Sequence, residues 1–209
     1  DGDGDAFAES ALEAGGFGGN VIGAGRELGN AEVAGIAGDG GVANLSGRMD
    51  GGNLIVETGP GWVCANAGID QSNAVADGVV TLLPVDPDAS AQQLRTALRG
   101  HFGVDLAIVI TDTFGRPWRE GQVEFALGVA GMAPVDDLRG THDMTGHELG
   151  VTVIGVADEI ACAAGLAMRK AAGIPAVLVR GCEVAPESPD EAARGGRSLI
   201  RPREHDLFR

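Results

Sequence analysis

Several features are missing from this chain of 209 residues, and each absence removes a class of protein. No apolar run reaches the roughly 18 residues that a membrane-spanning helix needs, so we expect no membrane partner. The formal charge of −15 at pH 7 leaves no dominant basic surface, which argues against nucleic acid as a partner. Residues 1–5 are acidic rather than basic, so we expect no signal peptide.

Cysteine and lysine are also scarce. The three cysteines are odd in number and widely spaced, and no Cys-x-x-Cys pair occurs. This pattern predicts reduced thiols in a cytoplasmic protein. Lys170 is the single lysine, so arginines are the default anion-binding side chains. The sequence also lacks the Gly-Lys-Ser/Thr of a phosphate loop and the Gly-x-Ser-x-Gly of a hydrolase nucleophile.

Glycine is abundant but unevenly distributed. Sixteen of the 35 glycines lie in the first 53 residues, with few large apolar residues between them. Glycine loses more conformational freedom on folding than any other residue, so such a segment is costly to order. We therefore expect residues 1–47 to be a poorly ordered segment and residues 48–209 to be the folded core.

The core alternates apolar runs with helical patterns. Strands are predicted at 53–58, 62–65, 79–83, 104–110, 123–129, 151–156 and 175–179. Helices are predicted from Asp88, as the N-cap, to residue 102, and from Asp158 to about residue 171. Residues 131–147 and 182–197 are expected to be loops. This order predicts an α/β or α+β fold with a mixed β-sheet and flanking helices.

The stretch from 104 to 122 is the most informative. Residues 104–110 are apolar and rich in β-branched residues, which predicts a strand buried on both faces. Thr111, Asp112 and Thr113 follow, and the carboxyl end of such a strand is where open α/β sheets bind ligands. Arg116 and Arg119 come next, and guanidinium groups bind phosphate oxygens.

A second carboxylate could join the first. Asp70 also follows an apolar segment, and two carboxylates with the Thr113 oxygens would suit Mg²⁺ or Mn²⁺. The alternative is that Asp70 only caps a turn through its side chain. Arg169 and Lys170 also allow two interpretations. Their positive charges could interact with the dipole at the C-terminal end of a helix, or they could bind a nucleotide phosphate.

Taken together, these stretches resemble the coenzyme F-420:L-glutamate ligase family, the γ-glutamyl ligases of deazaflavin coenzyme biosynthesis. The matching stretches follow the family order and cover roughly residues 48–209, at 62–73, 83–90, 111–122, 128–131, 156–159, 174–181 and 201–208. The block 111–122 is long and unusual, which makes the resemblance specific.

The resemblance implies an activity and a fold. The family uses GTP to join L-glutamate to the phospholactyl carboxylate of a coenzyme F-420 precursor, through an acyl phosphate, and releases GDP and phosphate. It uses Mg²⁺ or Mn²⁺, works as a homodimer, and has an α+β fold of its own that is neither a P-loop nor a Rossmann fold. We therefore expect a cytoplasmic, dimeric ligase.

The resemblance also implies roles for particular residues. Asp70, Asp112 and Thr113 match the family's metal ligands, and Asn73 matches a nucleotide contact. The nucleotide-contacting segment corresponds to Met168, Arg169, Lys170, Ala171, Ala172, Gly173, Ile174 and Pro175. Lys170 occupies the position of a further metal ligand in some members of the family. An ammonium group cannot bind a metal ion, so here either another group supplies that ligand or Lys170 binds a phosphate instead. We add Arg116 and Arg119, with Asp112, as catalytic candidates that would clamp phosphate.

The beginning of the chain departs from the family. Residues 1–47 contain no lysine and lack the family's Leu-Pro segment and nucleotide-binding motif. We expect a truncation, an altered frame or a divergence there, with part of the guanine-nucleotide site incomplete. Two other hypotheses therefore stay open: an inactive relative that binds metal or deazaflavin or only dimerises, and a metal-dependent phosphate-ester hydrolase.

Overall fold

The computed structural model describes residues 26–28, 42–44, 49–50, 53–70 and 80–206. The helices among them are α3 (Pro87–Phe102), α4 (Val156–Met168) and α5 (Pro189–Arg194), with short 3-10 turns η1 (Asn66–Gly68), η2 (Gly195–Leu199) and η3 (Arg203–His205). The strands are β1 (Arg26–Leu28), β2 (Val42–Asn44), β3 (Met49–Asp50), β4 (Asn53–Thr58), β5 (Val63–Ala65), β6 (Val80–Leu82), β7 (Ile108–Arg116), β8 (Arg119–Ala130), β9 (Asp136–Asp137) and β10 (Val153–Ile154).

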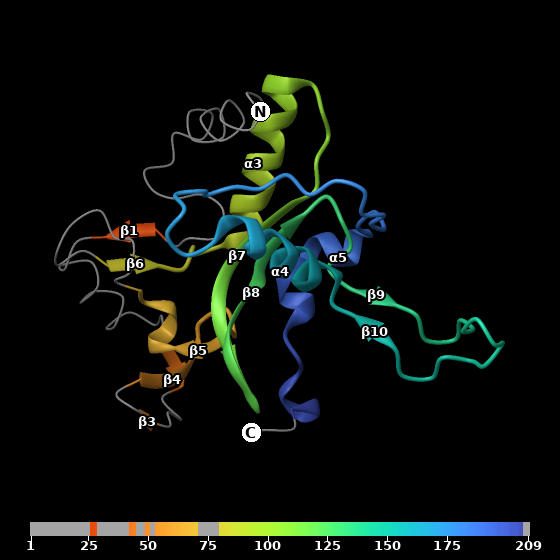
Figure 1. Cartoon of the computed structure of the whole chain (residues 1–209), viewed down its shortest axis with the longest axis horizontal. Coiled ribbons are helices and arrows are strands. Elements are labelled where there is room, and N and C mark those ends of the chain that lie inside the picture. The colour runs from red at the N-terminus through yellow and green to blue at the C-terminus, as the bar shows by residue number, and fades with distance from the viewer. Residues whose placement is uncertain (1–25, 29–41, 45–48, 51–52, 71–79, 207–209) are drawn as a thin grey trace.

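The centre of the fold is the long antiparallel hairpin of β7 and β8, which lies between α3 and α4 (Figure 1). On one face Ile108 and Ile110 pack with Leu94 and Leu98 of α3. On the other face Val109 packs with the apolar side of α4. Burying each leucine contributes roughly 1.5–3 kcal/mol, so the two helices fix the hairpin on both faces. The predicted double burial is confirmed for this part of β7.

Capping residues at both ends determine where helix α3 begins and ends. The side chain of Asp86 accepts a hydrogen bond from the backbone N–H of Ala89 at 2.9 Å, and Pro87 occupies the first turn. Gly103 ends the helix in the left-handed conformation, with φ of 69°. The end at Gly103 is confirmed, but the prediction of Asp88 as the N-cap is wrong because Asp86 holds that position.

Asp88 and Asp158 instead hold the edge of β8. Asp88 accepts hydrogen bonds from the backbone N–H groups of Val129 at 2.9 Å and Gly196 at 2.7 Å. Asp158 accepts one from Ala126 at 2.9 Å. Each carboxylate ties the first turn of a helix to β8 and satisfies a strand N–H. The prediction that Asp158 caps α4 is therefore wrong: the N-cap is Gly155, and α4 ends at Met168, before residue 171.

The smaller sheets surround this centre. Strand β4 pairs with β2, β3 and β5, and β6 pairs with β1. Every pairing among the described strands is antiparallel, so the parallel pairs of the predicted mixed sheet are missing from this part of the chain. The α+β class is confirmed, whereas the assignment to a fold of the family's own stays a prediction.

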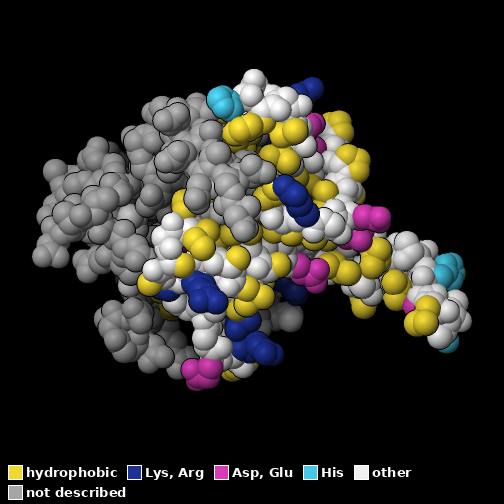
Figure 2. Space-filling model, turned by 45° about the horizontal axis from the view of Figure 1, so that its top comes forward, with side chains coloured by type: hydrophobic (Ala, Val, Ile, Leu, Met, Phe, Trp, Pro, Cys, Tyr) yellow, Lys and Arg dark blue, Asp and Glu magenta, His cyan; other side chains and the backbone are white. Residues whose placement is uncertain are grey.

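A narrow arm projects from the body between β9 and β10 (Figure 1). Its tip is held by local bonds, since Asp143 accepts from the backbone N–H of His147 at 2.9 Å and from Thr145 at 2.8 Å. Figure 2 shows histidine and hydrophobic side chains mixed along the arm. The predicted strand at 151–156 is shorter than expected, and the predicted loop at 131–147 contains β9.

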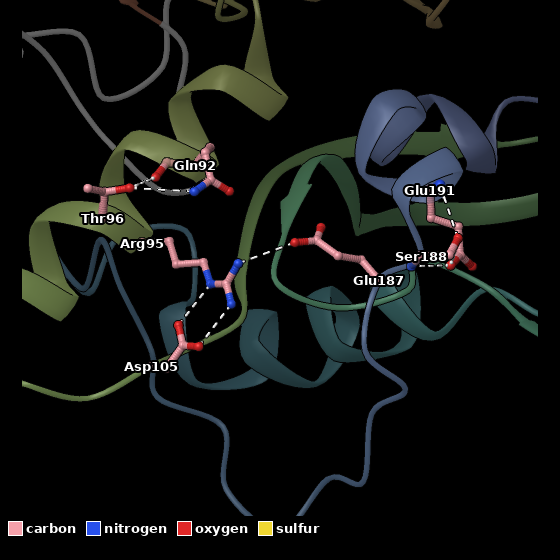
Figure 3. Close-up of polar contacts among 7 residues, drawn as sticks. All are labelled: Gln92, Arg95, Thr96, Asp105, Glu187, Ser188 and Glu191. Carbon is pink, nitrogen blue, oxygen red and sulfur yellow. Dashed lines mark hydrogen bonds and ion pairs between the residues drawn. The ribbon is translucent and has the colours of Figure 1, made fainter.

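The C-terminal third differs most from the prediction. Residues 175–179 have no regular secondary structure, so the strand predicted there is wrong. The predicted loop at 182–197 contains α5, which Ser188 and Glu191 begin with a capping box. Arg95 of α3 binds Asp105 at 3.0 Å and Glu187 at 3.2 Å, which holds this segment against the core (Figure 3).

Two further observations concern the chain as a whole. In the part of the chain that the structure describes, no helix combines the length and apolar character needed to cross a bilayer. Most of the glycine-rich segment 1–47 lies outside the described residues, and only β1 and β2 belong to it. The predicted poor order of that segment, and the boundary at residue 48, stay predictions.

Candidate functional site

Asp112 lies inside β7, not in a loop after it. Strand β7 starts at Ile108 and continues through Arg116, so the predicted strand at 104–110 begins too early and ends too early. Its partner is the antiparallel β8, with Asp112 opposite Phe125 and Thr113 opposite Glu124. The expected crevice at the carboxyl ends of parallel strands is therefore absent among the described strands, and the hairpin itself positions Asp112.

The carboxyl group of Asp112 is buried in an unfavourable electrostatic setting. The pKa of Asp112 is raised from 3.8 to about 6, chiefly by burial and also by the negative charges of Glu124 and Asp70. The backbone N–H of Thr113, which donates to Asp112 at 2.8 Å, and the charge of Lys170 oppose this rise. Burial raises the pKa of the Cys64 thiol to about 12, and the negative charge of Asp112 contributes to this rise.

Asp70 follows η1, and its backbone pairs with that of Thr81 in β6. The backbone N–H of Thr81 donates to the carbonyl of Asp70 at 2.7 Å, and the N–H of Asp70 donates to the carbonyl of Thr81 at 3.1 Å. This pairing holds the main chain and leaves the carboxylate to other groups. The Nζ of Lys170 donates to Asp70 Oδ2 at 3.3 Å, and the Asp70 side chain is 48% exposed.

Asp70 and Asp112 are thus close enough for their charges to interact, and the charge of Lys170, which follows α4, acts on both carboxylates. They offer the hard oxygen atoms that Mg²⁺ and Mn²⁺ prefer, and their mutual repulsion is what a divalent cation would relieve. The fit is partial, because the ammonium of Lys170 holds Asp70. Within the described ranges, no three His, Cys, Asp or Glu side chains are grouped closely enough to hold a metal ion.

Glu124 is a charged neighbour that the sequence pattern did not identify. It lies on β8, and a Cβ added at Gly165 of α4 would meet its Cγ at 2.5 Å. The absence of a side chain at Gly165 thus gives Glu124 room to pass beneath α4, and the charge of Glu124 also raises the pKa of Asp112 on the neighbouring strand. The alternation of β8 predicted a half-buried strand, but nothing in that pattern marked Glu124 as part of a site.

The two arginines lie at the far end of the hairpin. Arg116 stands opposite Arg119, four residues beyond Asp112, so at about 3.3 Å per residue their backbones are roughly 13 Å away. No arginine is among the charges that shift the pKa of Asp112. The Nε of Arg116 is buried and has no hydrogen-bond partner among the described residues. The structure therefore separates the arginines from the carboxylates by several residues of strand.

The predicted nucleotide segment follows α4. Met168 is buried, whereas residues 169–174 are exposed and Pro175 is half-buried. Lys170 joins this segment to Asp70. Asn73 lies outside the described residues, so its predicted role has no structural counterpart here.

Comparisons with known proteins agree with this arrangement of motifs. The family model described as F420-0:Gamma-glutamyl ligase matches residues 42–181. A protein of Methanothermobacter thermautotrophicus named Coenzyme F420:L-glutamate ligase is 48% identical over 157 residues, which cover 75% of this chain and 61% of the relative. The protein of that name from Methanopyrus kandleri is 47% identical over 158 residues, 75% of this chain and 62% of the relative.

A third protein of the same name, from Methanocaldococcus jannaschii, is 41% identical over 157 residues, 75% of this chain and 60% of the relative. The chain thus spans about 61% of the length of the curated relatives it matches. The family match covers every described residue of the candidate site, from Asp70 to Pro175. The chain belongs to the F420-0:gamma-glutamyl ligase family.

Proposed function

We propose that this chain is a GTP-dependent amide ligase that adds L-glutamate to the phospholactyl carboxylate of a coenzyme F-420 precursor. The names of the relatives support glutamate ligation for this coenzyme. The observation that carries the proposal is the convergence of Asp70, Asp112 and Lys170 from segments far apart in the sequence.

The proposed reaction has two steps. A carboxylate oxygen of the precursor attacks the γ-phosphorus of GTP, the bond to the β-phosphate oxygen breaks, and GDP leaves. The glutamate nitrogen then attacks the carbonyl carbon of the acyl phosphate, phosphate leaves, and the nitrogen loses a proton to give the amide. The phosphate is a good leaving group, which a free carboxylate oxygen is not.

The candidate residues divide this work. Asp70, Asp112 and the oxygen atoms of Thr113 would hold Mg²⁺ or Mn²⁺, which when bound neutralises phosphate charge and orients the transferred group. Lys170 is close enough to Asp70 to bind a phosphate oxygen beside it. Arg116 and Arg119, which face each other at the hairpin end, would hold an anionic part of a substrate through their guanidinium groups. Residues 168–175 would line the nucleotide.

The test is incubation of the full chain with GTP, Mn²⁺, L-glutamate and the glutamate-free precursor, followed by mass spectrometry. We expect a product heavier by one glutamate residue, and one phosphate per amide formed. Asp112→Asn is the matched inactive variant and Asp136→Asn, an exposed carboxylate on β9, is the control. Binding of precursor without product would support the inactive relative, and phosphate release without glutamate would support the hydrolase.

The assembly and location stay predictions of the same proposal. Short strands with bare edges can pair with a second chain, which supports a homodimer. Light scattering at micromolar concentration should give twice the mass of the chain, and a monomer mass would contradict this. A cytoplasmic location is the setting that the reduced cysteines favour.

A further inference from the structure

The β7–β8 hairpin turns at Pro117 and Trp118, at the end that is remote from α3 (Figure 1). Proline followed by a residue of positive φ is a feature of type II turns, whose second central position usually holds glycine or asparagine. Trp118 has φ of 63°, a conformation that strains a bulky residue. It is also 87% exposed, so packing of the indole does little to offset that strain. Strain and exposure together indicate that the indole serves a molecule outside the fold.

The two arginines that flank this turn repel each other. Arg116 stands directly opposite Arg119, and like charges in directly opposed positions of a hairpin are unfavourable. The guanidinium group of Arg116 donates to the carbonyl oxygen of Glu120 at 3.4 Å. Neither arginine forms an ion pair with a carboxylate of the described residues. A bound anion would relieve the repulsion, so the hairpin end offers an anion site next to the indole.

Gly115 leaves an open surface beside the same turn. It pairs with Gln122, its φ is not positive, and a Cβ added to it would meet no described residue within 4 Å. The strand pairing is irregular between Gly115 and Arg116, but a bulge demands glycine only where φ is positive. Neither the backbone conformation nor the packing therefore requires glycine here. Glycine inside a strand often marks a place where a ligand approaches the backbone closely.

These features fit a flat aromatic ring that carries an anionic group. An indole stacks on such a ring, guanidinium groups bind the anion, and a strand without a side chain lets the ring lie close. We propose that the hairpin tip binds the ring end of the deazaflavin precursor, with the ring stacked on Trp118 and the phosphate held by the arginines. The hairpin tip comprises Gly115, Arg116, Trp118 and Arg119. The inference rests on the proposed function, because the precursor is the phosphorylated aromatic substrate of that reaction.

The place of the hairpin tip favours the precursor over GTP. The backbone of Arg116 is roughly 13 Å from that of Asp112, at about 3.3 Å per residue, so the tip contacts a part of a substrate remote from the reacting carboxylate. The ring is that remote part of the precursor. The proposed nucleotide segment, residues 168–175, instead follows α4, where Lys170 binds Asp70. Binding of the ring would thus help to position the carboxylate for phosphoryl transfer.

Calorimetric titration of the full chain with the glutamate-free precursor, without GTP or metal, tests this site. Millimolar phospholactate is the control ligand, because it keeps the phosphate and the carboxylate but has no ring. Trp118→Asn removes the indole and keeps a residue that accepts positive φ. It should weaken precursor binding about tenfold and leave phospholactate binding unchanged, and Trp118→Phe should retain most of the parent affinity. Trp118→Asn should also unfold at the same or a higher temperature than the parent, because it relieves the strain.

A second pair of variants tests the open surface. Gly115→Ala should weaken precursor binding, because its methyl group occupies the space beside the ring. Gly100→Ala is the matched control, since Gly100 lies on α3 and a Cβ added there also meets nothing within 4 Å. It should leave precursor affinity unchanged.

The inference and the proposed function fail separately. If the variants lose precursor affinity as described but the parent forms no amide with GTP and glutamate, the ligase proposal fails and the binding site stands. Equal precursor affinity in the parent and Trp118→Asn overturns the inference, whatever the ligase activity. Absence of precursor binding by the parent, or a lower unfolding temperature of Trp118→Asn, also overturns it. So does a loss of GTP affinity or of a dimer in light scattering for that variant, because the tip would then contact the nucleotide or a second chain.

Discussion

Asp88 and Asp158 lie in the first turns of α3 and α4, whereas Asp112 lies within β7 and Asp70 forms an ion pair with Lys170, which follows α4. Burial is the main cause of the raised pKa values of Asp88, Asp112 and Asp158. Their partners differ: Asp88 and Asp158 bind backbone N–H groups of β8, and Asp112 faces the charges of Glu124 and Asp70. The carboxylates of Asp88 and Asp158 thus have hydrogen-bond donors within the fold, whereas Asp70 and Asp112 repel each other, and a bound cation would relieve that repulsion.

The largest expected effect comes from removing a satisfied carboxylate. Asp88→Ala should destabilise the protein by about 4 kcal/mol, because two buried N–H groups, of Val129 and Gly196, lose their acceptor. Asp88→Asn keeps an acceptor oxygen and should cost only about 1 kcal/mol. Urea unfolding at pH 7 measures both. If Asp88→Ala lost no more stability than Asp136→Ala, these bonds would not hold β8.

Removing the charge of Asp112 should stabilise the protein, whereas removing Asp88 destabilises it. Below pH 3.8 the carboxyl of Asp112 is protonated in both the folded and the unfolded chain. Between pH 3.8 and about 6 it ionises only in the unfolded chain, so the folded state loses relative stability as the pH rises through this range. Asp112→Asn removes this cost and should stabilise the metal-free protein by about 3 kcal/mol at pH 7. Unfolding of parent and variant at pH 7 and pH 4 should show the advantage shrinking in acid. A constant difference would contradict the ionisation argument.

Mn²⁺ affinity should also distinguish Asp70 and Asp112 from carboxylates outside the proposed metal site. Asp112→Asn and Asp70→Asn should each weaken Mn²⁺ binding at least tenfold, about 1.4 kcal/mol, because each removes one charged oxygen ligand. Asp88→Asn and Asp136→Asn should not change it. Calorimetric titration at pH 7 distinguishes these outcomes. Unchanged affinity in Asp112→Asn would remove β7 from the metal site.

The smallest effect is expected at Lys170. Its ion pair with Asp70 is exposed, and such pairs contribute little to stability. Lys170→Met should therefore leave the fold intact and tighten Mn²⁺ binding about threefold, because the ammonium no longer competes for Asp70. Weaker GTP binding by the same variant would separate a phosphate-binding role from simple competition. A loss of Mn²⁺ affinity would mean that Lys170 positions Asp70 instead.

The sequence predicted the elements with strong local signals. The helix end at Gly103 and the apolar core of β7 follow from residue type and spacing alone. The N-cap of α3 did not, because Asp86 and Asp88 flank Pro87 and only the preference of proline for the first turn separates them. Residues 175–179 are as apolar as a strand, but a strand also needs a ladder partner, which spacing cannot supply.

The site was predictable in part. The motif stretches identified Asp70 and Asp112, but local patterns gave no indication that Lys170 binds Asp70 across 100 residues of sequence. Glu124 was missed for a related reason, since its role depends on the missing side chain of Gly165 on another element. Contacts of this kind arise from packing, and only the folded chain displays them.

The bond from Gly196 to Asp88 also constrains how the protein is made. It joins residues 108 positions apart, and a Cβ at Gly196 would meet the carbonyl oxygen of Leu127 at 2.2 Å, so that backbone fits only as glycine. At 5–20 residues per second, a ribosome needs roughly 5–20 s to synthesise the intervening chain. Val129 is available to Asp88 after 41 residues, but the second donor is missing until Gly196 is made, so the contact between α3 and β8 stays incomplete for the rest of that interval.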